Sequence, residues 1–227
     1  MKAMLLAAGR GTRMQPLTDR TPKPLLKVGG KALIVWHLER LAAAGFKEIV
    51  INHAWLGEQI EQMIGHGSKW GLNIQYSPET TALETAGGIA KALPLLGNQP
   101  FLVMNADVWC DWQPVNALVP FKRLQDNANL QAWLLLVDNP VFHPAGDFHL
   151  NASGFVDDDH SARLTFSGVG IYSPSLFQSL TLNEPNKLAP LLRAAMLKQQ
   201  VIGEKYLGKW VDVGTPERLN TLNDFLT

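Results

Sequence analysis

A glycine-rich segment near the start of the chain carries residue types that bind phosphate. Residues 6–14 read LAAGRGTRM, and residues 22–26 follow as PKPLL. Glycines directly after a strand allow backbone N–H groups to approach phosphate oxygens. Arg13 can donate two parallel hydrogen bonds to a phosphate, and Lys23 adds a point charge beside the α-phosphate. This spacing predicts a binding site for a nucleoside triphosphate.

The segment differs from two common nucleotide motifs. The dinucleotide fingerprint needs a third glycine and a helix after the loop, whereas a long proline-containing loop follows here. A P-loop closes with Gly-Lys-Ser or Gly-Lys-Thr, and this loop does not. The glycine pattern therefore argues against a dinucleotide-dependent oxidoreductase. Taken alone, Gly9 and Gly11 fit a plain tight turn as well as a phosphate site.

Two aspartates follow strand-like segments far apart in the chain. Asp107 ends the run Asn-Ala-Asp after the apolar residues 101–104, and Asp212 lies in WVDVGTP, residues 210–216. Bringing two phosphate anions together needs Mg²⁺ to neutralise the developing charge. Carboxylates are hard oxygen ligands of the kind Mg²⁺ prefers. An aspartate after a strand often only caps a turn, but agreement with the phosphate segment favours Asp107 and Asp212 as Mg²⁺ ligands.

Composition and charge exclude several classes of protein. Lys and Arg total 20, as do Asp and Glu, so no net field attracts a nucleic acid or an anionic membrane surface. The single Cys110 rules out an internal disulfide and a cysteine-rich zinc site. The apolar start is too short for a signal peptide or a membrane span. We therefore expect no nucleic acid and no membrane partner, and a cytoplasmic location.

The hydrophobic pattern predicts alternating strands and helices in the first half of the chain. Strands are expected over residues 2–8, 48–52, 73–76 and 101–104, and helices over 34–41, 56–64 and 85–93. Gly45 and Gly65 are expected to end the first two helices, and the third is expected to be entered through Gly87 and Gly88. Such alternation indicates an α/β fold, in which ligands gather at the carboxyl ends of the strands.

The second half is less regular. Residues 131–137 are apolar without a clear alternation, and residues 148–172 contain several short strand-like runs, which predicts a β-rich lobe. Helices are expected over residues 187–198 and 216–225, with a strand over 210–213. Thr215 is the expected N-cap of the last helix, with Pro216 at its first position.

The combined motifs resemble the sugar-1-phosphate nucleotidyltransferases over essentially the whole chain. The resemblance implies a Rossmann-like three-layer α/β/α fold with a mixed central sheet and a small β-rich sugar-binding lobe. It also implies one domain over residues 1–227, with a nucleotide-binding part at about 1–110 and a sugar-binding part at about 111–227. No C-terminal β-helix domain is expected, and acetyl transfer is therefore not expected.

The resemblance also assigns a role to each motif. The glycine loop and its arginine hold the triphosphate, the lysine contacts the α-phosphate, and the aspartates bind Mg²⁺. By this resemblance Arg13 and Lys23 are catalytic, Asp107 and Asp212 bind the metal, Ala8, Gly9, Gly11, Thr12, Glu79, Gly87 and Gly88 complete the nucleotide site, and Asn105, Gly146 and Asp147 contact the sugar.

Four shorter stretches resemble one branch of this family, the N-acetylmuramate-1-phosphate uridylyltransferases of bacterial peptidoglycan recycling. They are residues 51–56 (INHAWL), 83–88 (LETAGG), 137–140 (VDNP) leading to 146–148 (GDF), and 165–168 (TFSG). The partners implied are UTP and N-acetylmuramate 1-phosphate. Two alternatives stay open: another sugar 1-phosphate or GTP as substrate, and a catalytically silent subunit that binds sugar nucleotides. The intact charged residues argue against a silent subunit.

The lactyl carboxylate of a muramate substrate requires a cation that no motif identifies. Lys187 and Arg193 are the first candidates because they share an expected helix beside the lobe, and Arg163 and His143 are further candidates. The Glu-Lys pair of many hexose-1-phosphate enzymes does not align with residues 156–160, which read VDDDH. No coiled-coil or repeat pattern demands an oligomer, so we expect a monomer.

Overall fold

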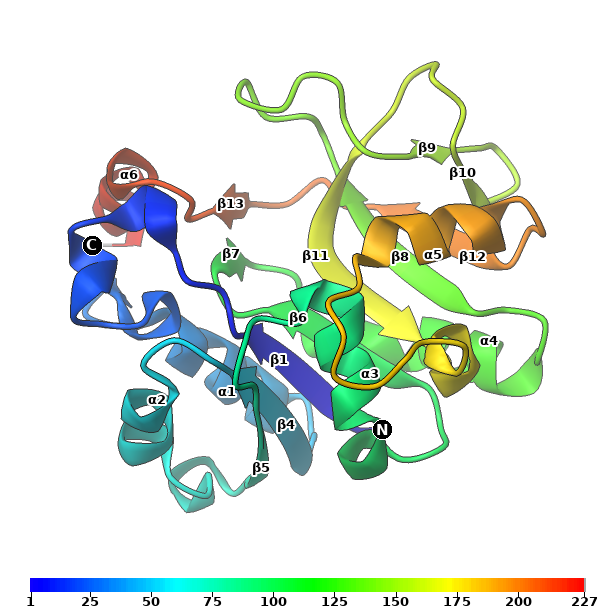
Figure 1. The fold of residues 1–227 in the computed structure, drawn as a ribbon. Helices are drawn as coiled ribbons and strands as arrows, with labels where there is room; N and C mark the ends of the chain where they lie inside the picture. The colour runs from blue at the N-terminus through cyan, green and yellow to red at the C-terminus, as the bar shows by residue number, and fades with distance from the viewer. Residues whose placement is uncertain (227) are drawn as a thin grey trace.

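The computed structural model describes residues 1–226, which form a mixed seven-stranded sheet between helices (Figure 1). In spatial order the strands are β12 (Val201–Lys205), β8 (Ala132–Val137), β11 (Thr165–Tyr172), β6 (Phe101–Asn105), β1 (Ala3–Ala7), β4 (Glu48–His53) and β5 (Asn73–Pro78). β6, β1, β4 and β5 run parallel to one another, whereas β11 runs antiparallel to both β6 and β8. The predicted α/β class and mixed central sheet are confirmed.

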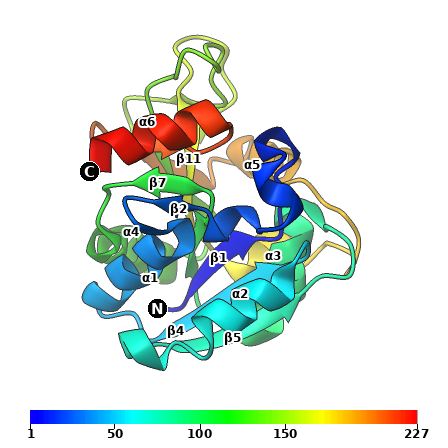
Figure 2. The same cartoon turned by 90° about the vertical axis from the view of Figure 1, so that its left-hand side faces the viewer.

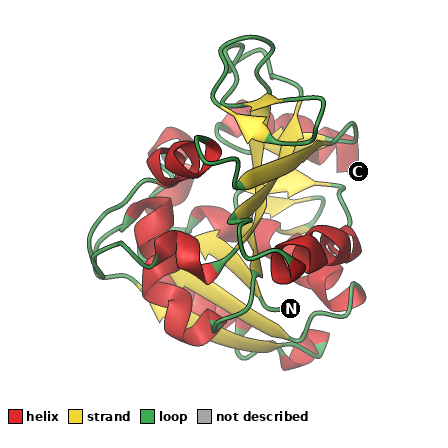
Figure 3. Cartoon of the chain, turned by 90° about the vertical axis from the view of Figure 1, so that its right-hand side faces the viewer, coloured by secondary structure: helices red, strands yellow, loops and turns green. Residues whose placement is uncertain are grey.

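Helices cover both faces of this sheet (Figure 3). α1 (Leu33–Ala43), α2 (Gly57–Ile64) and α4 (Leu118–Asp126) pack on one face, and α3 (Glu84–Leu96) and α5 (Leu188–Met196) pack on the other. Within residues 1–226, no helix combines the length and the apolar composition needed to cross a bilayer.

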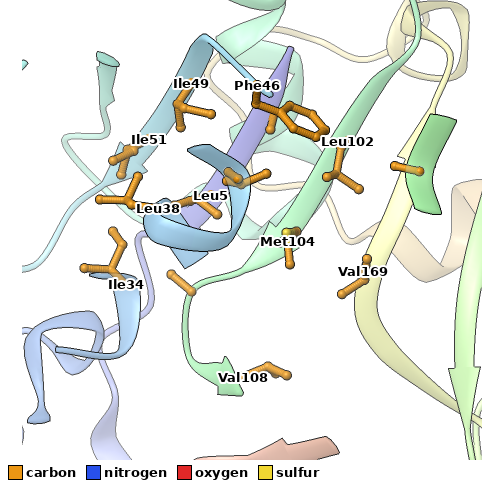
Figure 4. Close-up of a cluster of buried hydrophobic side chains, with 14 of the residues drawn as sticks. Leu5, Ile34, Leu38, Phe46, Ile49, Ile51, Leu102, Met104, Val108 and Val169 are labelled. Carbon is orange, nitrogen blue, oxygen red and sulfur yellow. The ribbon is translucent and has the colours of Figure 1, made fainter. Parts of the chain in front are cut away.

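The strands are apolar on both faces because each face is buried under helices. In β1, Ala3 and Leu5 join the core under α1, whereas Met4 between them joins the core under α3. Figure 4 shows Ile34 and Leu38 of α1 lying over the side chains of the neighbouring strands. Burying a leucine or isoleucine in this way contributes about 1.5–3 kcal/mol each. This packing anchors the strands whose ends form the site.

A second, smaller assembly lies beside the sheet. β7 (Val108–Cys110) pairs antiparallel with β13 (Trp210–Asp212), and α6 (Pro216–Leu226) covers them near the β2 (Lys27–Val28) and β3 (Lys31–Ala32) hairpin (Figure 2). Met14, Val213 and Leu222 share the core of this assembly. The last segment of the chain is thereby fixed against the first.

Most of the predicted elements are present within one to three residues of the expected bounds. One expectation was wrong: Gly87 and Gly88 lie inside α3, which already begins at Glu84. The expected β-rich lobe over residues 148–172 also needs correction, because residues 165–172 form β11 of the central sheet. The lobe itself contains β9 (His149–Leu150), β10 (Val156–Asp157) and loops. α4, β7 and β12 were not predicted.

Candidate active site

A cavity of about 420 Å³ opens at the carboxyl ends of β1, β4 and β6. β1 lies between β4 and β6 and is parallel to both, so the segments that follow these strands emerge at one edge. The predicted site residues that line the cavity are Ala8, Gly9, Gly11, Thr12, Arg13, Lys23, Glu79, Asn105 and Asp107.

The glycine loop is held in a fixed shape after β1. Gly11 has a φ of 67° and precedes a short 3₁₀ turn, Thr12–Met14. Met14 is fully buried in the core under α6, and the Thr18 hydroxyl donates to the Gly11 carbonyl at 2.8 Å. A Cβ at Gly11 would lie 3.0 Å from Thr18 Cγ2 as well as requiring a strained φ. The turn therefore leaves Arg13 exposed at the cavity.

Arg10, the other arginine of the loop, supports it from outside the cavity. Its guanidinium stacks 3.8 Å above the Trp55 ring and donates to the Thr18 carbonyl at 3.0 Å. Trp55 Nε1 donates to the same carbonyl. In the LAAGRGTRM segment, Arg10 therefore stabilises the loop, whereas Arg13 lines the cavity.

Lys23, in the PKPLL segment, forms an ion pair with Asp107, which follows β6. It begins the 3₁₀ turn Lys23–Leu25, and its side chain is only 7% exposed. Nζ lies 2.5 Å from Asp107 Oδ2. A buried ammonium needs such a partner, because leaving it unpaired would cost several kcal/mol, roughly. The ion pair holds Lys23 at the floor of the cavity.

The pairing of β7 with β13 brings the two predicted metal ligands together. Asp212 is opposite Val108, and the Val213 N–H donates to the Asp107 carbonyl at 3.2 Å. Asp212 itself accepts a 2.8 Å hydrogen bond from Arg218. Asp212 is not among the cavity-lining residues, but Gly214, two residues on, is.

The donor set fits Mg²⁺ when substrate completes it. Within residues 1–226, no three His, Cys, Asp or Glu side chains cluster as a complete metal site. Asp107 and Asp212 alone supply two carboxylates, which is the usual protein contribution where Mg²⁺ also binds substrate phosphates and waters. The residues present therefore suit a metal that enters with a nucleotide.

A neutral histidine supports the strand behind Asp107. His37 on α1 is buried, and burial lowers its pKa to about 4 against the opposing effect of its hydrogen bond to Val108. The neutral ring donates from Nε2 to the Val108 carbonyl at 2.8 Å. This bond ties α1 to β7 next to Asp107.

A chain of side-chain hydrogen bonds shapes the opposite wall. Asn52, at the end of β4, accepts from the Ala7 N–H at 3.0 Å and donates to Glu79 Oε1 at 2.7 Å. The other oxygen of Glu79 accepts from the Leu83 N–H at 2.9 Å. Glu79 is 6% exposed, so its carboxylate is held rigidly at the start of α3.

Gly88 is a glycine because this hydrogen-bonded pair lies directly against it. A Cβ there would lie 2.6 Å from Glu79 Oε1 and 2.8 Å from Asn52 Nδ2. We expect Gly88→Ala to destabilise the protein by about 1–3 kcal/mol through overpacking and to weaken nucleotide binding. Urea unfolding measures the first effect. In an open helix the same change would instead stabilise, by up to about 1 kcal/mol, so a gain in stability would contradict this account.

Gly87 and Gly88 are not among the residues that line the cavity. A Cβ at Gly87 would lie 2.4 Å from the Glu184 carbonyl oxygen, and the Gly87 N–H donates to the Asn186 carbonyl at 3.1 Å. The first turn of α3 faces the cavity instead, through Glu84 and Thr85. Gly88 lies one turn after Glu84 on the same side of the helix, where it packs against Glu79 and Asn52. Contact of Gly87 and Gly88 with a nucleotide stays a prediction.

Sequence reasoning missed the lining residues Asn52, Ala82, Glu84, Thr85 and Gly214. Glu84 has a φ of 58°, which non-glycine residues rarely adopt and which clusters at functional sites. Residue type does not reveal such a conformation. The stretch LETAGG did mark this region, although the cavity is lined by its first half.

Asn105 lines the cavity and contacts β11. It ends β6 and packs against Gly168, where a Cβ would lie 2.7 Å from Asn105 Nδ2. The pairing of β11 with β8 shifts register between Phe166 and Gly170, and Trp210 Nε1 donates to the Ser167 carbonyl in this irregular stretch at 2.8 Å. The TFSG segment thus leads into an irregular part of β11 beside Asn105.

Gly146 and Asp147 lie in the lobe, outside the cavity lining. A Cβ at Gly146, whose φ is 63°, would lie 2.8 Å from Asn139 Oδ1. Asp147 accepts from the Phe166 N–H at 2.8 Å and from His143 Nε2 at 3.1 Å. Both residues hold the lobe loop against β11, and their contact with a sugar stays a prediction.

The candidate cations for a substrate carboxylate are mostly paired within the lobe. Asp158 bonds to Arg163 NH2 at 2.8 Å and to Arg193 Nε at 3.1 Å. His143 is paired with Asp147, and Lys187 directly precedes α5. None of these contacts assigns a lactyl-binding role.

Comparison with known proteins agrees with this geometry. A family model described as "Nucleotidyl transferase" matches residues 2–140, and the chain is 55% identical over 222 residues to an N-acetylmuramate alpha-1-phosphate uridylyltransferase of Neisseria meningitidis serogroup B. That alignment covers 96% of this chain and 95% of the relative. The chain belongs to the nucleotidyltransferase family. The predicted sugar-1-phosphate nucleotidyltransferase resemblance is therefore confirmed.

A second relative and one solved structure extend the match. An N-acetylmuramate alpha-1-phosphate uridylyltransferase of Caulobacter vibrioides is 36% identical over 225 residues, covering 95% of this chain and 92% of the relative. A solved chain of Bacillus anthracis, assigned as a glucose-1-phosphate thymidylyltransferase, superposes with a TM-score of 0.86 at 19% identity, over 100% of this chain and 95% of that one. At that identity the superposition shows the nucleotidyltransferase fold alone.

Proposed function

We propose that this nucleotidyltransferase transfers a uridylyl group from UTP to N-acetylmuramate 1-phosphate, giving UDP-N-acetylmuramate and pyrophosphate. The observation that carries the proposal is 55% identity over 96% of the chain to a uridylyltransferase of that specificity. The cavity adds a phosphate loop, a lysine and two carboxylates at one sheet edge. We place the reaction in bacterial peptidoglycan recycling in the cytoplasm, where UTP is available.

In the proposed mechanism, the backbone of residues 11–13 and the Arg13 side chain hold the β- and γ-phosphates. Lys23 Nζ leaves Asp107 for the α-phosphate, where it stabilises the charge that develops. Asp107 and Asp212 would hold Mg²⁺, which supplies charge neutralisation between the two phosphate groups. The base lies along Ala8, Gly9 and the Glu79 wall.

The chemical step needs no protein nucleophile. An oxygen of the sugar phosphate forms a bond to the α-phosphorus while the bond from that phosphorus to the bridging oxygen of pyrophosphate breaks. The sugar phosphate is already ionised near neutral pH, so positioning replaces a general base. Both oxygens of Glu79 accept hydrogen bonds from the protein, consistent with a structural role in base binding. Asn105, Gly146 and Asp147 are assigned to the sugar side.

The test is pyrophosphate release with Mg²⁺ over a grid of four nucleotides and four sugar 1-phosphates. UTP, dTTP, GTP and ATP are each combined with the 1-phosphates of N-acetylmuramate, N-acetylglucosamine, glucose and mannose. We expect UTP with N-acetylmuramate 1-phosphate to dominate. A different dominant pair would retain the site assignments and replace the substrate, and no turnover with any pair would favour a silent sugar-nucleotide-binding subunit.

A further inference from the structure

Arg218, in the first turn of α6, is fixed between three parts of the site. Its NH1 donates to Asp212 Oδ2 at 2.8 Å, and its guanidinium lies 3.9 Å above the ring of Phe142 in the lobe. A Cβ at Gly214 would lie 2.4 Å from Arg218 NH2. The side chains of Arg218 and Asp212 are only 19% and 20% exposed. This contact is therefore a partly buried ion pair next to a cavity-lining glycine.

The other predicted metal ligand is paired in the same way. Lys23 Nζ lies 2.5 Å from Asp107 Oδ2, so each carboxylate already has a side-chain cation within hydrogen-bonding distance. Lys23, Asp107, Arg218 and Asp212 together carry no net charge. A divalent ion that enters this neutral cluster is attracted only weakly. It must also compete with Lys23 for Asp107 and with Arg218 for Asp212, because the metal ion and these cations repel each other.

We propose that Arg218 is a positioning residue whose guanidinium occupies the place of the metal on Asp212. Mg²⁺ then binds Asp212 by displacing this guanidinium, so that one cation is exchanged for the other. The inference rests on the proposed role of Asp212 as a metal ligand. Until the exchange occurs, the pair keeps Asp212 oriented and its charge neutralised. Phe142 keeps the released guanidinium at the site through its aromatic face.

The exchange has a consequence for the order of binding. The four-residue cluster is neutral, whereas the triphosphate brings negative charge. The metal ion is therefore expected to bind the protein far more tightly in the presence of nucleotide than in its absence. Removing Arg218 removes the competitor from Asp212. The free protein without Arg218 should then bind metal more tightly, which is the opposite of what loss of a purely structural support would cause.

The experiment measures Mn²⁺ binding to the nucleotide-free protein by electron paramagnetic resonance. The variants are Arg218→Met, Arg218→Gln and Arg218→Lys, with Arg123→Met as a matched control because Arg123 is an exposed arginine on α4. Arg218→Met and Arg218→Gln should bind Mn²⁺ about tenfold more tightly, as when one opposing charge is removed from a carboxylate. Arg218→Lys keeps the charge and should stay near wild type, as should Arg123→Met.

Weaker or unchanged Mn²⁺ binding in folded Arg218→Met and Arg218→Gln would overturn the exchange. Circular dichroism establishes folding, and the glutamine variant keeps the site testable if the methionine variant unfolds. Asp212→Asn separates the two levels of the argument. If it binds Mn²⁺ as tightly as wild type, the metal assignment itself fails; if it binds more weakly while Arg218→Met also binds more weakly, only the exchange fails.

Discussion

Replacing Lys23 by alanine is expected to lower kcat about a thousandfold, the scale of losing one preorganised charge from a transition state. In the proposed mechanism Nζ is the side-chain cation at the α-phosphate, and its burial at 7% exposure prevents water from substituting for it. Stability should fall by only about 1 kcal/mol, because Asp107 is partly exposed and can be solvated once its partner is lost. Pyrophosphate release under saturating substrates measures kcat, and urea unfolding measures stability.

Lys27→Ala is the matched control for this variant. Lys27 lies four residues further along the chain, in β2, and its side chain is exposed. Its removal changes the net charge equally and should leave kcat within about twofold of wild type, as for most surface substitutions. Near-normal turnover in a folded Lys23→Ala protein would remove Lys23 from the catalytic machinery.

Asp107→Asn and Asp212→Asn are each expected to lower turnover by about a thousandfold or more, because each removes a carboxylate from the proposed Mg²⁺ site. Each change also leaves a cation without its partner, Lys23 in one case and Arg218 in the other. The double variant should be little worse than either single one, since groups that act as a unit are not additive. Pyrophosphate release measured against Mg²⁺ concentration gives both turnover and metal requirement.

Asp126→Asn serves as the control for the aspartate variants. Asp126 ends α4 and pairs with Lys122 at 3.5 Å on the surface, so its loss should leave the Mg²⁺ dependence unchanged. An Asp107→Asn or Asp212→Asn protein with the wild-type Mg²⁺ dependence and turnover would exclude that residue as a metal ligand.

The fold was predictable where local pattern and burial agree. The apolar runs that became β1, β4 and β6 are followed by or end in glycine or polar residues, and Gly45 and Gly65 follow the ends of α1 and α2. β7 and β12 were missed because runs of only three and five residues form a strand only when a partner strand lies beside them. Likewise, residues 165–172 belong to the central sheet because β6 and β8 pair with them on either side.

The site was predictable in its charged residues and less so in its walls. Arg13, Lys23 and Asp107 are the residue types that triphosphate and metal require, and all three line the cavity. Their grouping was inferred without knowing that Lys23 and Asp107 form an ion pair. For α3 the sequence pointed to Gly87 and Gly88, whereas Glu84 and Thr85 line the cavity and Gly88 packs against Glu79.

The sequence by itself determined the chemistry available to this protein: a phosphate loop, a lysine and two strand-end aspartates whose types bind triphosphate and Mg²⁺. Only the tertiary structure decided their partners. β7 and β13 join residues a hundred or more positions apart, and α6 then places Arg218 on Asp212. Residue type limits which bonds a side chain can form, whereas the pairing of distant strands determines which of those bonds are made.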